Sequence, residues 1–146
     1  MISVSESFFA RWNSAGLDSS IAKVYPAGER PKSKNNPHGT PVGNDLPRAE
    51  YEISNPPPQK KTRNSRMFMV PIVVRVWGSG NKTVAEYVQL IKDKYVNAES
   101  TMTMSGGDIL EVDEGKAGTK KVDDGVVAGM VMLLFRVRVG NAEVTS

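Results

Sequence analysis

Met67-Phe-Met-Val-Pro-Ile-Val-Val-Arg-Val-Trp77 is an almost unbroken run of strand-forming residues, and Gly78-Ser-Gly80 ends it. We expect an amphipathic helix to begin at Thr83, because Thr83 and Glu86 have the spacing of a capping box. Its apolar positions recur at helical spacing on one face, at Val84, Tyr87, Val88, Ile91 and Tyr95. A long strand followed by a helix with one apolar face indicates a sheet that is covered by helices on one side. The segment 67–95 therefore predicts a compact α+β domain.

A second long strand is expected near the end of the chain, over Val126–Val139. Its odd positions from Val131 to Val139 are all apolar and should face the core. Its even positions are half apolar and half cationic: Met130, Met132, Leu134, Arg136 and Arg138. A sheet face that is exposed to water is normally more polar than this. We therefore predict that a helix or another subunit covers this second face.

The remaining elements are expected to be short. Ser3 and Glu6 form a capping box at the start of a helix that carries Phe8, Phe9 and Trp12 and ends near Gly16. Alternation and strand formers predict short strands over Ile21–Tyr25, Arg48–Ser54, Thr101–Met104 and Asp108–Val112.

Proline-rich segments interrupt these elements. Pro71 indicates an edge position or a bulge in the strand 67–77, because proline donates no ladder hydrogen bond. Residues 26–48 read as one long loop excursion, and residues 55–66 read as a proline-rich and basic loop. We predict a single α+β domain over 1–146, with a mixed, mainly antiparallel β-sheet and helices packed on one face.

Composition limits the possible classes of protein. The chain has 146 residues, a net charge of +3 and no cysteine, which excludes disulfides, zinc thiolates and a cysteine nucleophile. The N-terminus lacks the basic and apolar regions of a signal peptide. The longest apolar run, Val126–Phe135, is far shorter than the roughly 20 residues that span a bilayer. We expect a soluble protein with no membrane partner.

The motifs that could carry chemistry are weak. Gly78-Ser-Gly-Asn-Lys-Thr83 lies between a strand and a helix but lacks both glycines that a phosphate-binding loop needs before its lysine. The acids of 108–114 could flank a cation, but the EF-hand spacing is absent. His38 is the only histidine and is expected to be a loop residue. We predict no catalytic, cofactor or metal site; an enzyme using Asp108–Glu114 with a metal is the weakest alternative.

Charge is unevenly distributed along the chain. The segment 59–66 carries four cations and no acid: Lys60, Lys61, Arg63 and Arg66. The segment 99–124 has seven acids against three lysines, and its central cluster comprises Asp108, Glu111, Asp113 and Glu114. Either these are two solvated loops, or they are patches that meet between neighbouring copies in a ring. Stacking aromatics near the cations are few, which disfavours direct DNA binding.

The order of elements resembles the tail terminator (tail completion) proteins of long-tailed bacteriophages. The likeness rests on Leu46-Pro47-Arg-Ala-Glu-Tyr51-Glu-Ile53, the basic loop around Thr62, the strand Phe68–Trp77, the helix Thr83–Tyr95 and the long final strand.

This resemblance implies a non-enzymatic virion protein of the tail or neck, assembled in the host cytoplasm. It would form a ring, commonly of six subunits, that caps the tail tube, ends tube polymerisation and offers a surface to a neck or head-completion protein. DNA would pass through the lumen without specific binding. Met130, Met132, Arg136 and Arg138 would line a subunit or tube contact, and the cations of 60–66 would face an acidic neighbour or the lumen. The alternatives are another head-tail connector or neck adaptor, or a small nucleic-acid-binding protein with a basic loop.

Overall fold

The structure is a computed structural model that describes residues 4–27, 46–53, 60–61, 65–104, 106–123 and 125–140. Along the chain the elements are α1 (Val4–Ser14), α2 (Leu17–Ser20), β1 (Val24–Pro26), β2 (Arg48–Ile53), β3 (Lys60–Lys61), β4 (Ser65–Gly78), α3 (Asn81–Tyr95), the 3₁₀ helix η2 (Glu99–Thr101), β5 (Gly107–Asp123) and β6 (Val126–Gly140).

The strands form one six-stranded sheet in the order β1-β2-β4-β6-β5, and β3 pairs with β4 beside this row. Among the strands of the described residues, β1 pairs with β2 in parallel, and the other pairings are antiparallel. The long pairing of β4 with β6 runs from Ser65 opposite Gly140 to Gly78 opposite Val127 and forms the centre of the sheet. The predicted α+β class, with a mixed and mainly antiparallel sheet, is confirmed.

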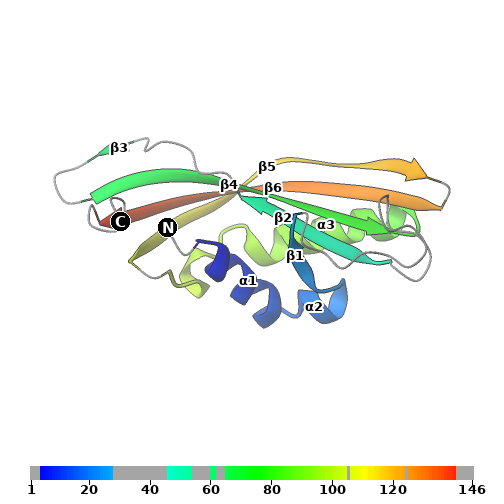
Figure 1. The fold of residues 1–146 in the computed structure, drawn as a ribbon, viewed down its shortest axis with the longest axis horizontal. Helices are drawn as coiled ribbons and strands as arrows, with labels where there is room; N and C mark the ends of the chain where they lie inside the picture. The colour runs from blue at the N-terminus through cyan, green and yellow to red at the C-terminus, as the bar shows by residue number, and fades with distance from the viewer. Residues whose placement is uncertain are drawn as a thin grey trace.

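The helices lie on one side of the sheet (Figure 1). Val84, Val88, Ile91 and Tyr95 of α3 are buried, as the helical spacing predicts. The odd positions of β6 from 131 to 139 are also buried. Their alternation along the strand places them all on the side that faces the helices. These apolar surfaces make up the core.

An aromatic cluster joins α1 to this core. The Phe8 ring stacks on Tyr95 of α3 at 5.0 Å between centroids and lies 4.8 Å from Tyr51 of β2. Tyr95 in turn meets the ring of Phe135 of β6 edge-on. The Trp12 indole N–H donates to the Ala22 carbonyl at 2.9 Å, which secures the turn after α2. One helix is thereby held against elements from both halves of the chain.

Two predicted boundaries are wrong. The helix α3 begins at Asn81, with Gly80 as its N-cap and no side-chain cap hydrogen bond, so Thr83 is not the cap. The backbone N–H of Val84 instead donates to the Gly80 carbonyl at 3.1 Å, which starts the helix two residues early. The first short strand is β1 at Val24–Pro26, because these three residues form the ladder with β2. Ser3, the other expected cap, lies outside the described residues.

The segment after α3 differs most from the prediction. Thr101–Met104 is not a strand: η2 ends at Thr101, and Met104 makes only an isolated bridge to Gly107. The strand expected at Asp108–Val112 extends over Gly107–Asp123. Its second half is polar and rich in glycine and lysine, so pairing with β6, rather than local propensity, makes it a strand.

Pro71 lies in β4, an interior strand, so the predicted edge or bulge is wrong for the strand as a whole. Its position still follows the same physical rule. β2 pairs with β4 only from Ile72 onward, and β3 pairs only at Arg66 and Met67. Within the described part of the chain, Pro71 therefore has a ladder partner on the β6 side alone, opposite Leu134. On the β2 side no described strand pairs with Pro71, so the absent N–H breaks no ladder hydrogen bond there.

The close approach of α3 to the sheet depends on Gly129 of β6. A methyl group there would lie 2.6 Å from Val84 and 2.8 Å from Val88, both on α3. We expect Gly129→Ala to lower the free energy of unfolding by about 1–3 kcal/mol, because the helix must shift. Gly118→Ala on β5 is the matched control, since its methyl group would enter open space. Urea denaturation of both variants measures the difference, and equal midpoints would contradict this packing account.

Candidate interaction surface

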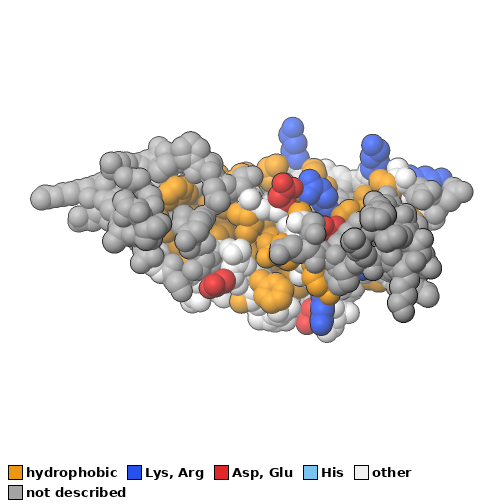
Figure 2. Space-filling view, in the orientation of Figure 1, with side chains coloured by type: hydrophobic (Ala, Val, Ile, Leu, Met, Phe, Trp, Pro, Cys, Tyr) orange, Lys and Arg blue, Asp and Glu red, His pale blue; other side chains and the backbone are white. Residues whose placement is uncertain are grey.

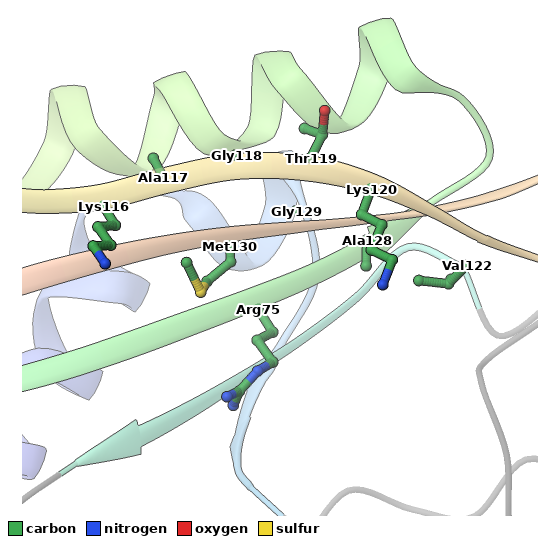
Figure 3. A pocket seen from close by; sticks show the side chains of 10 residues that line it. All are labelled: Arg75, Lys116, Ala117, Gly118, Thr119, Lys120, Val122, Ala128, Gly129 and Met130. Carbon is green, nitrogen blue, oxygen red and sulfur yellow. The ribbon is translucent and has the colours of Figure 1, made fainter.

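The side of the sheet opposite the helices, here called the open face, carries the second set of strand side chains. It includes the even positions of β6 and the odd positions of β4. In Figure 3, viewed onto this side, the strands cross in front of the helices. None of the described helices packs on it. The described residues therefore leave the open face without a second layer.

The centre of the open face is apolar. Cross-strand partners there are Pro71 with Leu134, Val73 with Met132, and Arg75 with Met130. We call Pro71, Val73, Met130, Met132 and Leu134 the apolar band; all five are only half-buried. In Figure 2, which has the orientation of Figure 1, Lys and Arg side chains project from the upper edge of the molecule and hydrophobic side chains are visible across its middle. The sequence prediction of a half-apolar, half-cationic second face is confirmed for β6.

Ion pairs border the apolar band at one end. Arg138 of β6 pairs with Asp108 of β5 at 2.8 Å, and Arg136 pairs with Glu111 at 3.3 Å. On the other side of the band, Arg75 of β4 pairs with Glu52 of β2 at 3.2 Å. These side chains are substantially exposed, so each pair contributes little to stability. They place paired charges along the rim of the face.

Two groups of site residues that the sequence analysis assigned to separate patches therefore meet within one chain. The arginines of β6 and the acids of β5 lie side by side because β5 and β6 are neighbours in the sheet. Much of the charge of Asp108 and Glu111 is already balanced. Less of it remains for the predicted contact with a basic loop of a neighbour.

Glu111 has a second acidic neighbour. A hydrogen bond with Asp113 raises the pKa of Glu111, and the negative charge of Asp113 raises it further, while Arg136 opposes the change. Two carboxyl groups here share one nearby arginine, an arrangement of like charges that favours one bound proton. No group of three or more acidic or histidine side chains in the described ranges could hold a metal ion.

Glu114 belongs to the other side of the sheet. Its carboxylate pairs with Lys92 of α3 at 3.5 Å, so it supports the helix layer and is separated from Glu111 and Asp113. The register of β5 against β6 shifts between Glu114 and Ala117, which marks a β-bulge. A bulge inserts an extra residue and exchanges the faces beyond it. The Thr119 hydroxyl accordingly donates a hydrogen bond to the side-chain oxygen of Asn81 of α3, at 2.8 Å.

The bulge turns Lys116 and Lys120 toward the open face, where they help to form a groove of about 580 Å³. Its floor consists of small residues, and its other sides are Arg75, Val122 and Met130; the full lining is Arg75, Lys116, Ala117, Gly118, Thr119, Lys120, Val122, Ala128, Gly129 and Met130. Figure 3 shows Met130 between Lys116 and Arg75. Sequence reasoning missed these cations, because strand parity cannot be carried across an unseen bulge.

The basic segment 60–66 is only partly described. Lys60 and Lys61 form β3 and pair with Met67 and Arg66 of β4. Arg63 lies outside the described residues, as does the loop that contains His38. The role of these cations toward a neighbour or DNA stays a prediction.

None of the helices within the described residues is long and apolar enough to cross a membrane.

Comparison with solved structures shows what this fold is similar to. No family model matches the chain, and no curated protein matches it. A chain from a solved structure described as the virion of a native gene transfer agent (GTA) particle superposes with a TM-score of 0.59 at 16% sequence identity. The match covers 94% of this chain and 95% of that chain. The two chains therefore share a fold over nearly their whole length.

Proposed function

We propose that this protein is a structural component of a phage-like virion, and that it forms a ring capping the tail tube. The observation that carries the proposal is the fold shared with a chain of a GTA virion over 94% of this protein. The resemblance of its element order to tail terminators supports the finer assignment. In this role the protein ends tube polymerisation and presents a surface to a neck or head-completion protein. It needs no catalysis.

The open face supplies a suitable surface for assembly. Its half-buried apolar band is bordered by ordered ion pairs, an arrangement like the apolar core and polar rim of protein interfaces. A ring that closes on itself needs two different patches on each subunit. We assign Met130, Met132, Arg136 and Arg138 to the contact with a neighbouring subunit or the tube. The rim charges set register and association rate more than affinity.

The proposed function is tested by deleting the gene for this protein from the genome that encodes the particle. We expect particles whose tails have irregular, excess length and lack joined heads, and wild-type protein supplied in trans should restore uniform tails. The double variant Arg136→Glu/Arg138→Glu should fail to do so, because it places a block of negative charge on the open face beside Asp108 and Glu111. Electron microscopy measures tail length and head attachment.

The same gene deletion distinguishes a ring that caps the tail tube from the main alternative, a neck adaptor. A neck adaptor of this fold would give finished tails of normal length that fail to join heads. Normal, infectious particles after deletion would contradict a structural role in the virion altogether.

A further inference from the structure

Two large apolar side chains are exposed among the described residues, and they lie on opposite sides of the molecule. Phe9 of α1 has 43% of its surface exposed, and Val122 of β5 has 40%. Val122 lines the groove on the open face. Phe9 belongs to the helix layer, on the other side of the sheet. A single contact between copies would cover both.

Phe9 sits in an exposed surface of α1 that is suited to insertion. Glu6, Phe9, Ala10 and Asn13 recur at helical spacing and are all exposed, whereas the adjacent Phe8 is fully buried. Glu6 precedes Phe9 by three residues, so the two side chains are neighbours on the helix surface. No ion pair joins Glu6 to another of the described residues. We call Glu6, Phe9, Ala10 and Asn13 the α1 ridge.

The groove has the complementary character. Lys116 and Lys120 are exposed, and neither makes an ion pair within the described part of the chain. No acid is among its described lining residues. Val122 and Met130 give it apolar walls, and the small residues of its floor leave room for a ring. A lysine ammonium group is also attracted to the face of an aromatic ring, which favours an aromatic side chain in this groove.

We infer that the α1 ridge of one copy seats in this groove of the next copy, with Phe9 against Val122 and Met130 and Glu6 beside Lys116 or Lys120. The inference rests on the ring-forming part of the proposed function and names the two patches of the contact. The ridge and the groove lie on opposite sides of one sheet, so a chain cannot fill its own groove. The contact is head-to-tail, and such contacts generate rings or filaments instead of closed pairs.

A second copy fits the groove better than a nucleic acid does. Phosphate binding needs the cations but gives no role to exposed Val122 and Met130. The α1 ridge uses both the cations and the apolar walls. An exposed aromatic anchor entering a pocket is also the usual form of an interface hot spot.

Cysteine cross-linking tests the contact cleanly, because the chain contains no cysteine of its own. The variant Phe9→Cys/Val122→Cys is treated with a short bismaleimide and separated on a denaturing gel. We expect a ladder of covalent oligomers that ends at the ring number. Phe9→Cys/Gln89→Cys, which moves the second thiol to exposed Gln89 of α3, is the matched control and should give no ladder.

A second measurement follows association without cysteines. Phe9→Ala should raise the protein concentration needed for assembly by roughly tenfold or more, the change typical of a lost aromatic anchor. Light scattering across a dilution series measures this concentration. An unchanged threshold contradicts the inference.

The other outcomes are distinct. Oligomers in solution without a ladder overturn this contact and leave the ring intact. Cross-linked pairs that never extend overturn the head-to-tail geometry, and monomers without a ladder overturn the contact as well. Salt-dependent binding of duplex DNA that Lys116→Glu/Lys120→Glu abolishes, with no ladder, assigns the groove to nucleic acid instead. Tail morphology after gene deletion judges the virion role separately.

Discussion

Phe8→Ala will lower the free energy of unfolding by about 3–5 kcal/mol, the largest change we expect from a single substitution in this chain. Phe8 is fully buried, and its ring contacts Trp12, Tyr51 and Tyr95. Removing it leaves a cavity where α1, β2 and α3 meet, and such a cavity collapses poorly when its walls are rigid rings. The loss is a large fraction of the 5–15 kcal/mol that stabilises a typical domain.

Phe9→Ala is the matched control, because it makes the same substitution one residue later on a side chain that is 43% exposed. Its unfolding free energy should change by no more than about 0.5 kcal/mol. Urea unfolding, followed by tryptophan fluorescence and circular dichroism, measures both variants. The pair separates folding from assembly: Phe8→Ala impairs stability, while Phe9→Ala impairs association alone. Equal destabilisation by the two substitutions would contradict the orientation of α1.

Alkaline pH should destabilise the protein through Tyr95, the second large effect. The Tyr95 hydroxyl donates to the Phe8 carbonyl at 2.6 Å, and burial strongly raises the pKa of this phenol. In the unfolded chain a tyrosine ionises near pH 10. The folded state keeps its proton to higher pH, so stability contributed by Tyr95 is complete below pH 10 and is lost as pH rises above it. Well above pH 10 the slope approaches about 1.4 kcal/mol per pH unit, so about 2 kcal/mol of stability is lost between pH 10 and pH 12.

Tyr95→Phe isolates this contribution from that of other groups. At pH 7 the variant should be less stable by about 1–3 kcal/mol, because the buried hydrogen bond from the Tyr95 hydroxyl to the Phe8 carbonyl is lost. Above pH 10 only the wild-type protein retains a buried hydroxyl that ionises on unfolding. The stability difference between the two proteins should therefore shrink and close near pH 12. Urea midpoints measured from pH 7 to pH 12 test this, and parallel curves would rule it out.

The candidate interface was predictable from the sequence in one strand and not in its neighbours. Alternation alone gave the half-apolar, half-cationic face of β6, with Met130 and Met132 beside Arg136 and Arg138. The same local rule could not show that Asp108 and Glu111 lie opposite the two arginines, since this depends on which strand pairs with β6. It also placed Glu114 with the other acids, whereas the structure turns it toward Lys92.

The sequence by itself determined β4, α3 and β6, because each carries a long periodic apolar pattern that fixes its conformation and its buried side. Tertiary structure alone decided the length of β5. The polar residues after Val112 have little strand propensity, and β6 holds them extended by supplying hydrogen-bond partners. Tertiary structure alone also formed the groove. The bulge between Glu114 and Ala117 exchanges the faces of β5 and turns Lys116 and Lys120 toward the open face. A bulge is set by the register between two strands, and register is a property of the pair that neither segment encodes alone.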